Sequence, residues 1–171
     1  MILSRAGLLA QRVEWQAANK KIVFTNGCFD LLHLGHIRYL QEARALGDIL
    51  VLGLNSDASV RQLKGPQRPL VGQQERAELM SALRPVDHVI VFEELTAESL
   101  LAELKPEIYV KGGDYSPSEA ASTAGKILPE APTVRSYGGQ IVLIPFLPGH
   151  STSDLIRHIL RAYSPAPTPA K

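Results

Sequence analysis

Residues 22–36 constrain the fold of this chain more than any other segment. An apolar, β-branched run ends there at Asn26-Gly27, which is typical of a buried strand, and apolar residues from Leu34 onward recur at helical spacing. A strand, a turn and a helix therefore follow one another. Unpaired N–H groups and the positive end of the helix dipole meet at such a junction, so the turn predicts a phosphate-binding site.

Two histidines stand at the start of this predicted helix. His33 and His36 are three residues apart, which places both imidazoles on one side of a helical turn. Gly27 and Gly35 have no Cβ and let a bulky anion approach the backbone closely. Each feature alone also occurs in proteins that bind no phosphate, as a surface or core histidine or as a plain strand-to-helix turn. Their combination favours hydrogen-bond donors aimed at a bound phosphate.

Strands and helices alternate along the rest of the chain. Strands are predicted at 49–54, 87–92, 107–110 and 140–145, with helices between them. The alternation predicts an α/β fold of the Rossmann-like class, in which a doubly wound parallel five-stranded sheet carries helices on both faces.

Two local expectations accompany this fold. The stretch 60–70 contains a glycine, two prolines and several cations, so we expect a loop there. In the helix predicted at 73–83, we expect Leu79, Met80 and Leu83 to face inward.

The chain length fits a single domain. The 171 residues are 45% hydrophobic, an ordinary globular composition, and we expect residues 1–163 to form one domain with an N-terminal helix at 1–20 and a core at 21–163. The tail at 164–171 alternates proline with small residues and is expected to be disordered. The segment 116–132 predicts no clear element.

The net charge and the number of cysteines limit which binding partners and which cellular compartment the sequence predicts. A net charge of +1 argues against an electrostatic nucleic-acid binder. The one cysteine, Cys28, allows no disulfide within the chain, which fits a reducing cytoplasm. The absence of a signal-peptide core and of any membrane-length apolar run predicts a soluble cytoplasmic protein with no membrane partner.

Polar residues follow the carboxyl ends of the predicted strands, where open α/β sheets bind ligands. Asn55 and Asp57 follow the second strand, and Lys111-Gly112 follow the fourth. The hydroxyl residues 151–153 begin the last helix. Each group has two interpretations, a capping or simple turn on one side and contacts to ligand phosphate on the other.

Three of the cations in or just after the loop predicted at 60–70 are candidates for phosphate binding. Lys64 and Arg68 are close in sequence to the expected phosphate site, and Arg76 can project from the first turns of the following helix. Ammonium and guanidinium groups are the usual partners of phosphate oxygens. A solvated loop is the alternative, and we favour a binding role for Lys64 and Arg68.

Residues 27–36 read Gly-Cys-Phe-Asp-Leu-Leu-His-Leu-Gly-His, which resembles the His-x-Gly-His signature of the cytidylyltransferase-like nucleotidylyltransferase superfamily. Asn-Ser-Asp-Ala-Ser-Val at 55–60, Leu-Lys-Gly-Pro at 63–66 and Val-Lys-Gly-Gly-Asp-Tyr at 110–115 make the resemblance narrower. Together with Ser-Thr-Ser at 151–153 they resemble D-glycero-β-D-manno-heptose 1-phosphate adenylyltransferases, which occur alone or fused to a sugar kinase.

One motif separates this chain from the glycerol-phosphate cytidylyltransferases, which typically carry Arg-Thr-Glu-Gly-Ile-Ser-Thr before the last helix. Residues 146–152 here read Phe-Leu-Pro-Gly-His-Ser-Thr, so the arginine is missing and His150 departs from the pattern. The cytidylyl interpretation is weakened accordingly.

The resemblance implies transfer of AMP from ATP to a sugar 1-phosphate, giving ADP-heptose and pyrophosphate for lipopolysaccharide core or related surface-glycan synthesis. ATP is then the co-substrate and Mg²⁺ arrives with the triphosphate, with no dedicated protein metal site; relatives imply a homodimer. A cytidylyltransferase for glycerol 3-phosphate and a non-catalytic nucleotide-binding module are the alternatives.

The resemblance also implies roles for individual residues. The implied catalytic residues are His33, His36 and Lys64. The implied nucleotide-binding residues are Thr25, Asn26, Gly27, Cys28, Phe29, Asp30, Gly35, Lys111, Gly112, Asp114, Ser151, Thr152 and Ser153. The implied acceptor-binding residues are Asn55, Asp57, Lys64, Arg68 and Arg76.

Overall fold

Five parallel strands form the central sheet of the computed structural model, which describes residues 1–113, 115–116 and 126–164. Their order across the sheet is β3-β2-β1-β4-β7. This arrangement confirms the predicted α/β fold with a doubly wound parallel sheet. The strands are β1 (Ile22–Gly27), β2 (Ile49–Asn55), β3 (His88–Phe92), β4 (Ile108–Gly112) and β7 (Gln140–Ile144).

The strand order reverses beside β1. The chain adds β2 and β3 on one side of β1, then returns to place β4 on the other side, where Val23, Phe24 and Thr25 pair with Ile108, Tyr109 and Val110. A crevice opens at such a reversal, beyond the carboxyl ends of the two strands, and ligands of open α/β proteins bind in it. The fold therefore places the turn after β1 and the end of β4 at its preferred ligand site.

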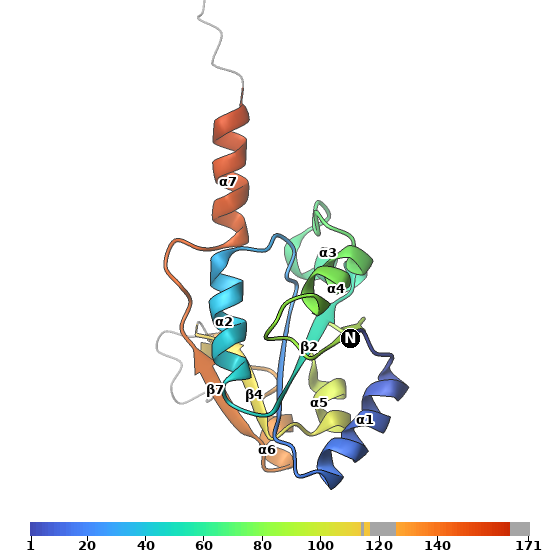
Figure 1. The fold of residues 1–171 in the computed structure, drawn as a ribbon. Coiled ribbons are helices and arrows are strands. Elements are labelled where there is room, and N and C mark those ends of the chain that lie inside the picture. The colour runs from blue at the N-terminus through green and yellow to red at the C-terminus, as the bar shows by residue number, and fades with distance from the viewer. Residues whose placement is uncertain (114, 117–125, 165–171) are drawn as a thin grey trace, which may run out of the picture.

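Helices cover both faces of the sheet (Figure 1). Alternate residues of β1 enter opposite cores: Phe24 packs in one hydrophobic cluster and Val23 in the other. The first cluster includes apolar residues of α1 (Arg5–Ala17), α5 (Glu98–Leu104) and α6 (Ala131–Ser136). The second includes Leu40 and Ala43 of α2 (Leu34–Arg44) and Ala77 and Met80 of α4 (Gln73–Ser81).

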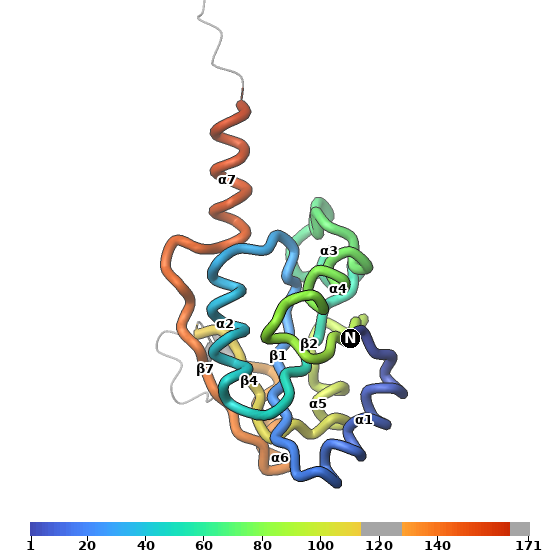
Figure 2. Tube along the Cα trace, in the orientation of Figure 1, coloured from blue at the N-terminus to red at the C-terminus, as the bar shows by residue number. Residues whose placement is uncertain are grey.

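The last helix, α7 (Thr152–Tyr163), differs from the others because none of its residues is buried. Figures 1 and 2 show it extending away from the rest of the described chain. A small parallel pair of strands, β5 (Tyr115–Ser116) and β6 (Lys126–Ile127), interrupts the segment in which no clear element was predicted. Residues 114, 117–125 and 165–171 lie outside the described residues, and with them Asp114, most of 116–132 and the predicted tail.

Two sequence-based expectations are wrong. The stretch 60–70 is not all loop, because α3 (Asp57–Lys64) occupies its first half: the Ser56 side chain caps this helix by accepting the Ser59 N–H, and the glycine and both prolines come only after the helix ends. Leu79 is 49% exposed, because Ala77 and Met80 form the buried stripe of α4.

Candidate active site

Two stacked imidazoles mark the start of α2. His33 is the N-cap residue with an extended backbone, His36 lies in the first turn, and their ring centroids are 3.8 Å apart at an interplanar angle of 22°. The Phe29 ring lies 5.1 Å from that of His36. Both Nδ1 atoms are buried without a hydrogen-bond partner. Two polar ring atoms are thus held ready beside a helix N-terminus.

Both histidines are held in the neutral form at pH 7. Burial, and to a smaller extent the neighbouring His33, lower the pKa of His36 to about 4. Burial also lowers the pKa of His33, as does the charge of His150, while Asp154 acts in the opposite direction. A neutral imidazole carries one N–H donor and one acceptor, so each ring can donate a hydrogen bond to a phosphate oxygen.

Gly35 allows the chain around His33 to close tightly. A Cβ at this position would lie 3.0 Å from the His33 ring and 3.2 Å from the Cβ of His150. The glycine therefore lets His33 fold back over α2 and lets the segment before α7 approach the histidine pair.

The end of β4 meets the end of β1 through Asn26. The Asn26 amide oxygen accepts hydrogen bonds from the Tyr109 hydroxyl and the Lys111 ammonium group, both at 2.8 Å. Thr25 is fully buried, and its hydroxyl lies 2.6 Å from that of Tyr39. Lys111 thus stands at the strand-order reversal, whereas the Thr25 side chain belongs to the core and leaves only backbone for a ligand.

Asp30 holds the loop that follows α3. Its buried carboxylate accepts the backbone N–H groups of Leu70 at 2.8 Å and Val71 at 2.9 Å, and the Nε–H of Arg68 at 2.6 Å. Burial alone would raise the pKa of Asp30, but the two N–H groups and the guanidinium outweigh burial and the pKa is lowered. Asp30 therefore fixes Arg68 beside the turn after β1.

Cations from four parts of the chain converge on Cys28. Burial raises the pKa of this half-buried thiol, while the charges of Lys64, Arg76, Arg68 and Lys111 act to lower it. A thiol with a raised pKa is a poor nucleophile at neutral pH. The positive charges around it make the turn attractive to phosphate.

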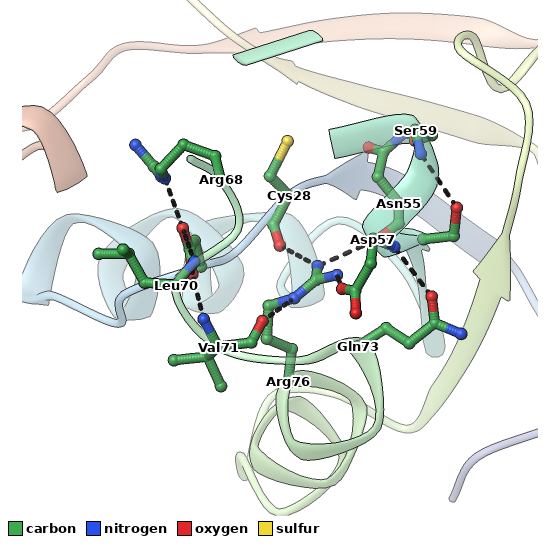
Figure 3. A network of polar contacts seen from close by, with 11 residues as sticks. Cys28, Asn55, Asp57, Ser59, Arg68, Leu70, Val71, Gln73 and Arg76 are labelled. Carbon is green, nitrogen blue, oxygen red and sulfur yellow. Dashed lines mark hydrogen bonds and ion pairs between the residues drawn. The ribbon is translucent and has the colours of Figure 1, made fainter. Parts of the chain in front are cut away.

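Three predicted acceptor-binding residues are engaged within the protein instead (Figure 3). The Arg76 guanidinium is fully buried and paired with Asp57 at 2.7 Å, and the Asn55 amide donates to Ser59 at 2.8 Å. Arg76 does not project from its helix as expected, because its N–H groups bind the Asp57 carboxylate and the carbonyls of Val71, Cys28 and Asn55. Lys64, in contrast, is exposed at the end of α3.

A cleft of about 440 Å³ separates His33 from α7. At its edge the Ser151 hydroxyl caps the helix by accepting the Asp154 N–H, Thr152 contacts the Leu31 carbonyl, and Ser153 is exposed. Sequence reasoning missed the basic side chains on its α7 wall, although their spacing of three to four residues on one helix was visible. These side chains are Arg157, His158 and Arg161.

Two further observations concern metals and membranes. Among the described residues, no group of three or more His, Cys, Asp or Glu side chains is placed to hold a metal ion. In the same part of the chain no helix combines the length and the apolar character needed to span a membrane.

A family model described as cytidylyltransferase-like matches residues 24–158. The chain belongs to the cytidylyltransferase-like family. Membership confirms the resemblance to nucleotidylyltransferases that the His-x-Gly-His signature indicated. It also confirms the expected enzyme class, a nucleotidyltransferase.

Curated relatives of this cytidylyltransferase-like chain are much longer than the chain itself. The bifunctional protein HldE of Pelobacter propionicus is 56% identical over 149 residues, which cover 87% of the chain and 29% of the relative. The HldE protein of Geobacter sulfurreducens is 51% identical over 158 residues, covering 92% of the chain and 30% of the relative. The chain therefore spans less than a third of the length of these relatives.

Solved structures agree with the fold. The lipopolysaccharide core biosynthesis protein of Thermoplasma volcanium is 30% identical, with a TM-score of 0.58, and the match covers 75% of the chain and 97% of that protein. Pantothenate synthetase of Thermus thermophilus, at 18% identity and a TM-score of 0.54 over 85% of the chain and 62% of the synthetase, shares the fold alone.

Proposed function

We propose that this domain transfers AMP from ATP to D-glycero-β-D-manno-heptose 1-phosphate, giving ADP-heptose and pyrophosphate for lipopolysaccharide core or related surface-glycan synthesis. The observation that carries the proposal is the neutral histidine pair at the start of α2, together with the cations around Cys28 in the turn that leads into this helix. The names of two relatives, bifunctional protein HldE and lipopolysaccharide core biosynthesis protein, support the choice of acceptor.

In the proposed reaction an oxygen of the sugar phosphate attacks the α-phosphorus of ATP. The bond from that phosphorus to the bridging oxygen breaks, and pyrophosphate leaves with the bonding electrons. His33 and His36 donate N–H hydrogen bonds to the phosphate oxygens, and Lys64 and Arg68 balance the charge of the acceptor phosphate. Catalysis comes from positioning and charge stabilisation.

Residues of the turn between β1 and α2, of the end of β4 and of the start of α7 complete the proposed nucleotide site. Mg²⁺ arrives bound to the triphosphate. The ring nitrogens of His33 and His36 that have no partner within the protein support the fit of a triphosphate. The proposed set is Thr25, Asn26, Gly27, Cys28, Phe29, Asp30, Gly35, Lys111, Gly112, Asp114, Ser151, Thr152 and Ser153, while Asn55 and Asp57 support the acceptor side through their contacts to Ser59 and Arg76.

The test is a pyrophosphate-release assay over pairs of nucleotide and acceptor, with the product weighed by mass spectrometry. We expect release with ATP and heptose 1-phosphate, and its loss when EDTA removes Mg²⁺. Preference for CTP and glycerol 3-phosphate would support the cytidylyl alternative. Nucleotide binding without release in any pair would support a non-catalytic module, and release that survives His36→Ala would overturn the role of His36.

We further propose that the chain forms a homodimer and acts in the cytoplasm as one domain over residues 1–163. The apolar side chains that α7 leaves exposed, Leu155, Ile159 and Leu160, support self-association. Light scattering should give twice the chain mass, and Ile159→Glu should halve it. A monomeric wild-type chain would overturn the dimer. Limited proteolysis in the presence of ATP should leave residues 1–163 intact.

A further inference from the structure

Arg76 is a fully buried charge outside the proposed contacts to substrate. Arginine is almost never fully buried unless it is paired. Here its Nη2 donates to the Asp57 carboxylate at 2.7 Å, its Nε to the Val71 carbonyl at 2.9 Å, and its Nη1 to the carbonyls of Cys28 at 2.6 Å and Asn55 at 3.0 Å. Every nitrogen of the guanidinium thus has a partner.

The four partners come from three separate segments. Cys28 lies in the turn after β1, Asn55 and Asp57 lie where β2 passes into α3, and Val71 lies in the loop before α4. Figure 3 shows the guanidinium between these groups. A planar guanidinium holds its N–H donors in fixed directions. One side chain therefore sets the relative placement of all three segments that accept from it.

Val71 connects Arg76 to the cationic loop, which is the segment 65–72 between α3 and α4 that carries Arg68. The Val71 carbonyl accepts from Arg76, while its N–H donates to Asp30, and the same Asp30 carboxylate holds Arg68. The loop is therefore fastened to the turn after β1 from two sides. Losing one fastening changes where Arg68 stands relative to Cys28.

We propose that Arg76 is a positioning residue that sets the distance between the nucleotide-binding turn and the cationic loop that receives the acceptor phosphate. The inference rests on the proposed function for its kinetic readout. Each half of the site keeps its own ligand contacts without Arg76, but the two halves lose their mutual alignment. Misplacement by about 1 Å can slow a reaction about 100-fold, because the reacting atoms no longer meet in line.

The test compares Arg76→Lys with a matched control, Arg12→Lys. The Arg12 side chain also donates to backbone carbonyls, those of Leu104 at 2.8 Å and Lys105 at 3.1 Å, and to a carboxylate, that of Glu107 at 3.0 Å. These partners precede β4, at the amino ends of the strands, opposite the site.

Both variants should melt at a lower temperature than the wild type. Only Arg76→Lys should lower kcat, by about 100-fold, with KM for each substrate changed less than threefold. A kcat no lower than that of Arg12→Lys, or a loss confined to KM, would overturn the proposal. If the lysine variant does not fold, as judged by circular dichroism, Arg76→Gln and Arg12→Gln replace the pair.

Hydrogen exchange gives a readout that needs no turnover. The backbone amides of Leu70 and Val71 should exchange faster in Arg76→Lys than in wild type and should be unchanged in Arg12→Lys. Unchanged exchange in this loop would overturn the positioning role even where the transfer reaction is confirmed. An inactive wild type with faster exchange in the variant would overturn the proposed function and leave the hold of Arg76 on the loop supported.

Discussion

Replacing Asp30 with asparagine should destabilise the protein far more than loss of a surface carboxylate. The buried carboxylate accepts two backbone N–H groups and one guanidinium. Asparagine offers one acceptor oxygen and turns an NH₂ group toward the remaining donors. Each buried donor left without a partner costs about 1–3 kcal/mol, so with one bond retained and two donors unpaired we expect a loss of about 2–6 kcal/mol. That loss corresponds to a fall in Tm of about 4–24 °C for a chain of this size.

Urea denaturation of Asp30→Asn beside Asp87→Asn measures this difference. Asp87 also accepts a backbone N–H, that of Leu50 at 2.8 Å, and pairs with Arg44 at 2.9 Å, but its side chain is 34% exposed. Water can replace the lost contacts there, so the control should lose less than about 1.5 kcal/mol. Equal losses in the two variants would refute the reasoning from burial.

The pH dependence provides a second check on Asp30. Because the folded-state pKa of Asp30 is lowered below its unfolded value, the stability it adds is present above the unfolded pKa and is lost as the pH falls through the folded pKa. The gap between wild type and Asp30→Asn should therefore be constant above about pH 5 and shrink below about pH 4. A gap that persists unchanged at low pH would contradict the ionised, hydrogen-bonded carboxylate.

Three further predictions concern substitutions of single residues. The folded pKa of His36, about 4, lies below its unfolded value, so wild type should lose more stability than His36→Asn in denaturation between pH 6.5 and 4. Lys64→Met should lower kcat/KM about 10–100-fold through loss of a charge-assisted phosphate contact, whereas Arg61→Met on the same helix should stay within twofold. Gly47→Ala should cost about 1–3 kcal/mol with kcat unchanged, because a Cβ there would lie 2.7 Å from the Lys21 carbonyl oxygen, far from the site.

The sequence was most informative where local chemistry decides structure. The apolar run before Asn26 and the helical spacing after Leu34 both depend on neighbours in sequence, and the strand, turn and helix formed as predicted. Lys111 could be placed at the carboxyl end of the fourth predicted strand, which is the edge where open α/β sheets bind ligands; the strand order beside it came only from the structure.

Sequence reasoning failed where a local helix cap was overlooked and where contacts between distant segments decide. Prolines 66 and 69 argued for a loop, but the Ser56 cap lets a helix form before them. The Arg76 guanidinium has the chemistry of a phosphate-binding group. Only the approach of the Asn55 and Cys28 carbonyls makes it a buried structural residue.

The exposure of α7 links its folding to ligand binding. A helix of 12 residues that buries none of them is marginal in water, since helices shorter than about 12–15 residues gain too little from their own hydrogen bonds. An anion that bridges His33 to Arg157 or Arg161 would supply the missing free energy. Helix content in this segment should then titrate with phosphate ligands, and part of their intrinsic affinity is consumed in ordering the helix.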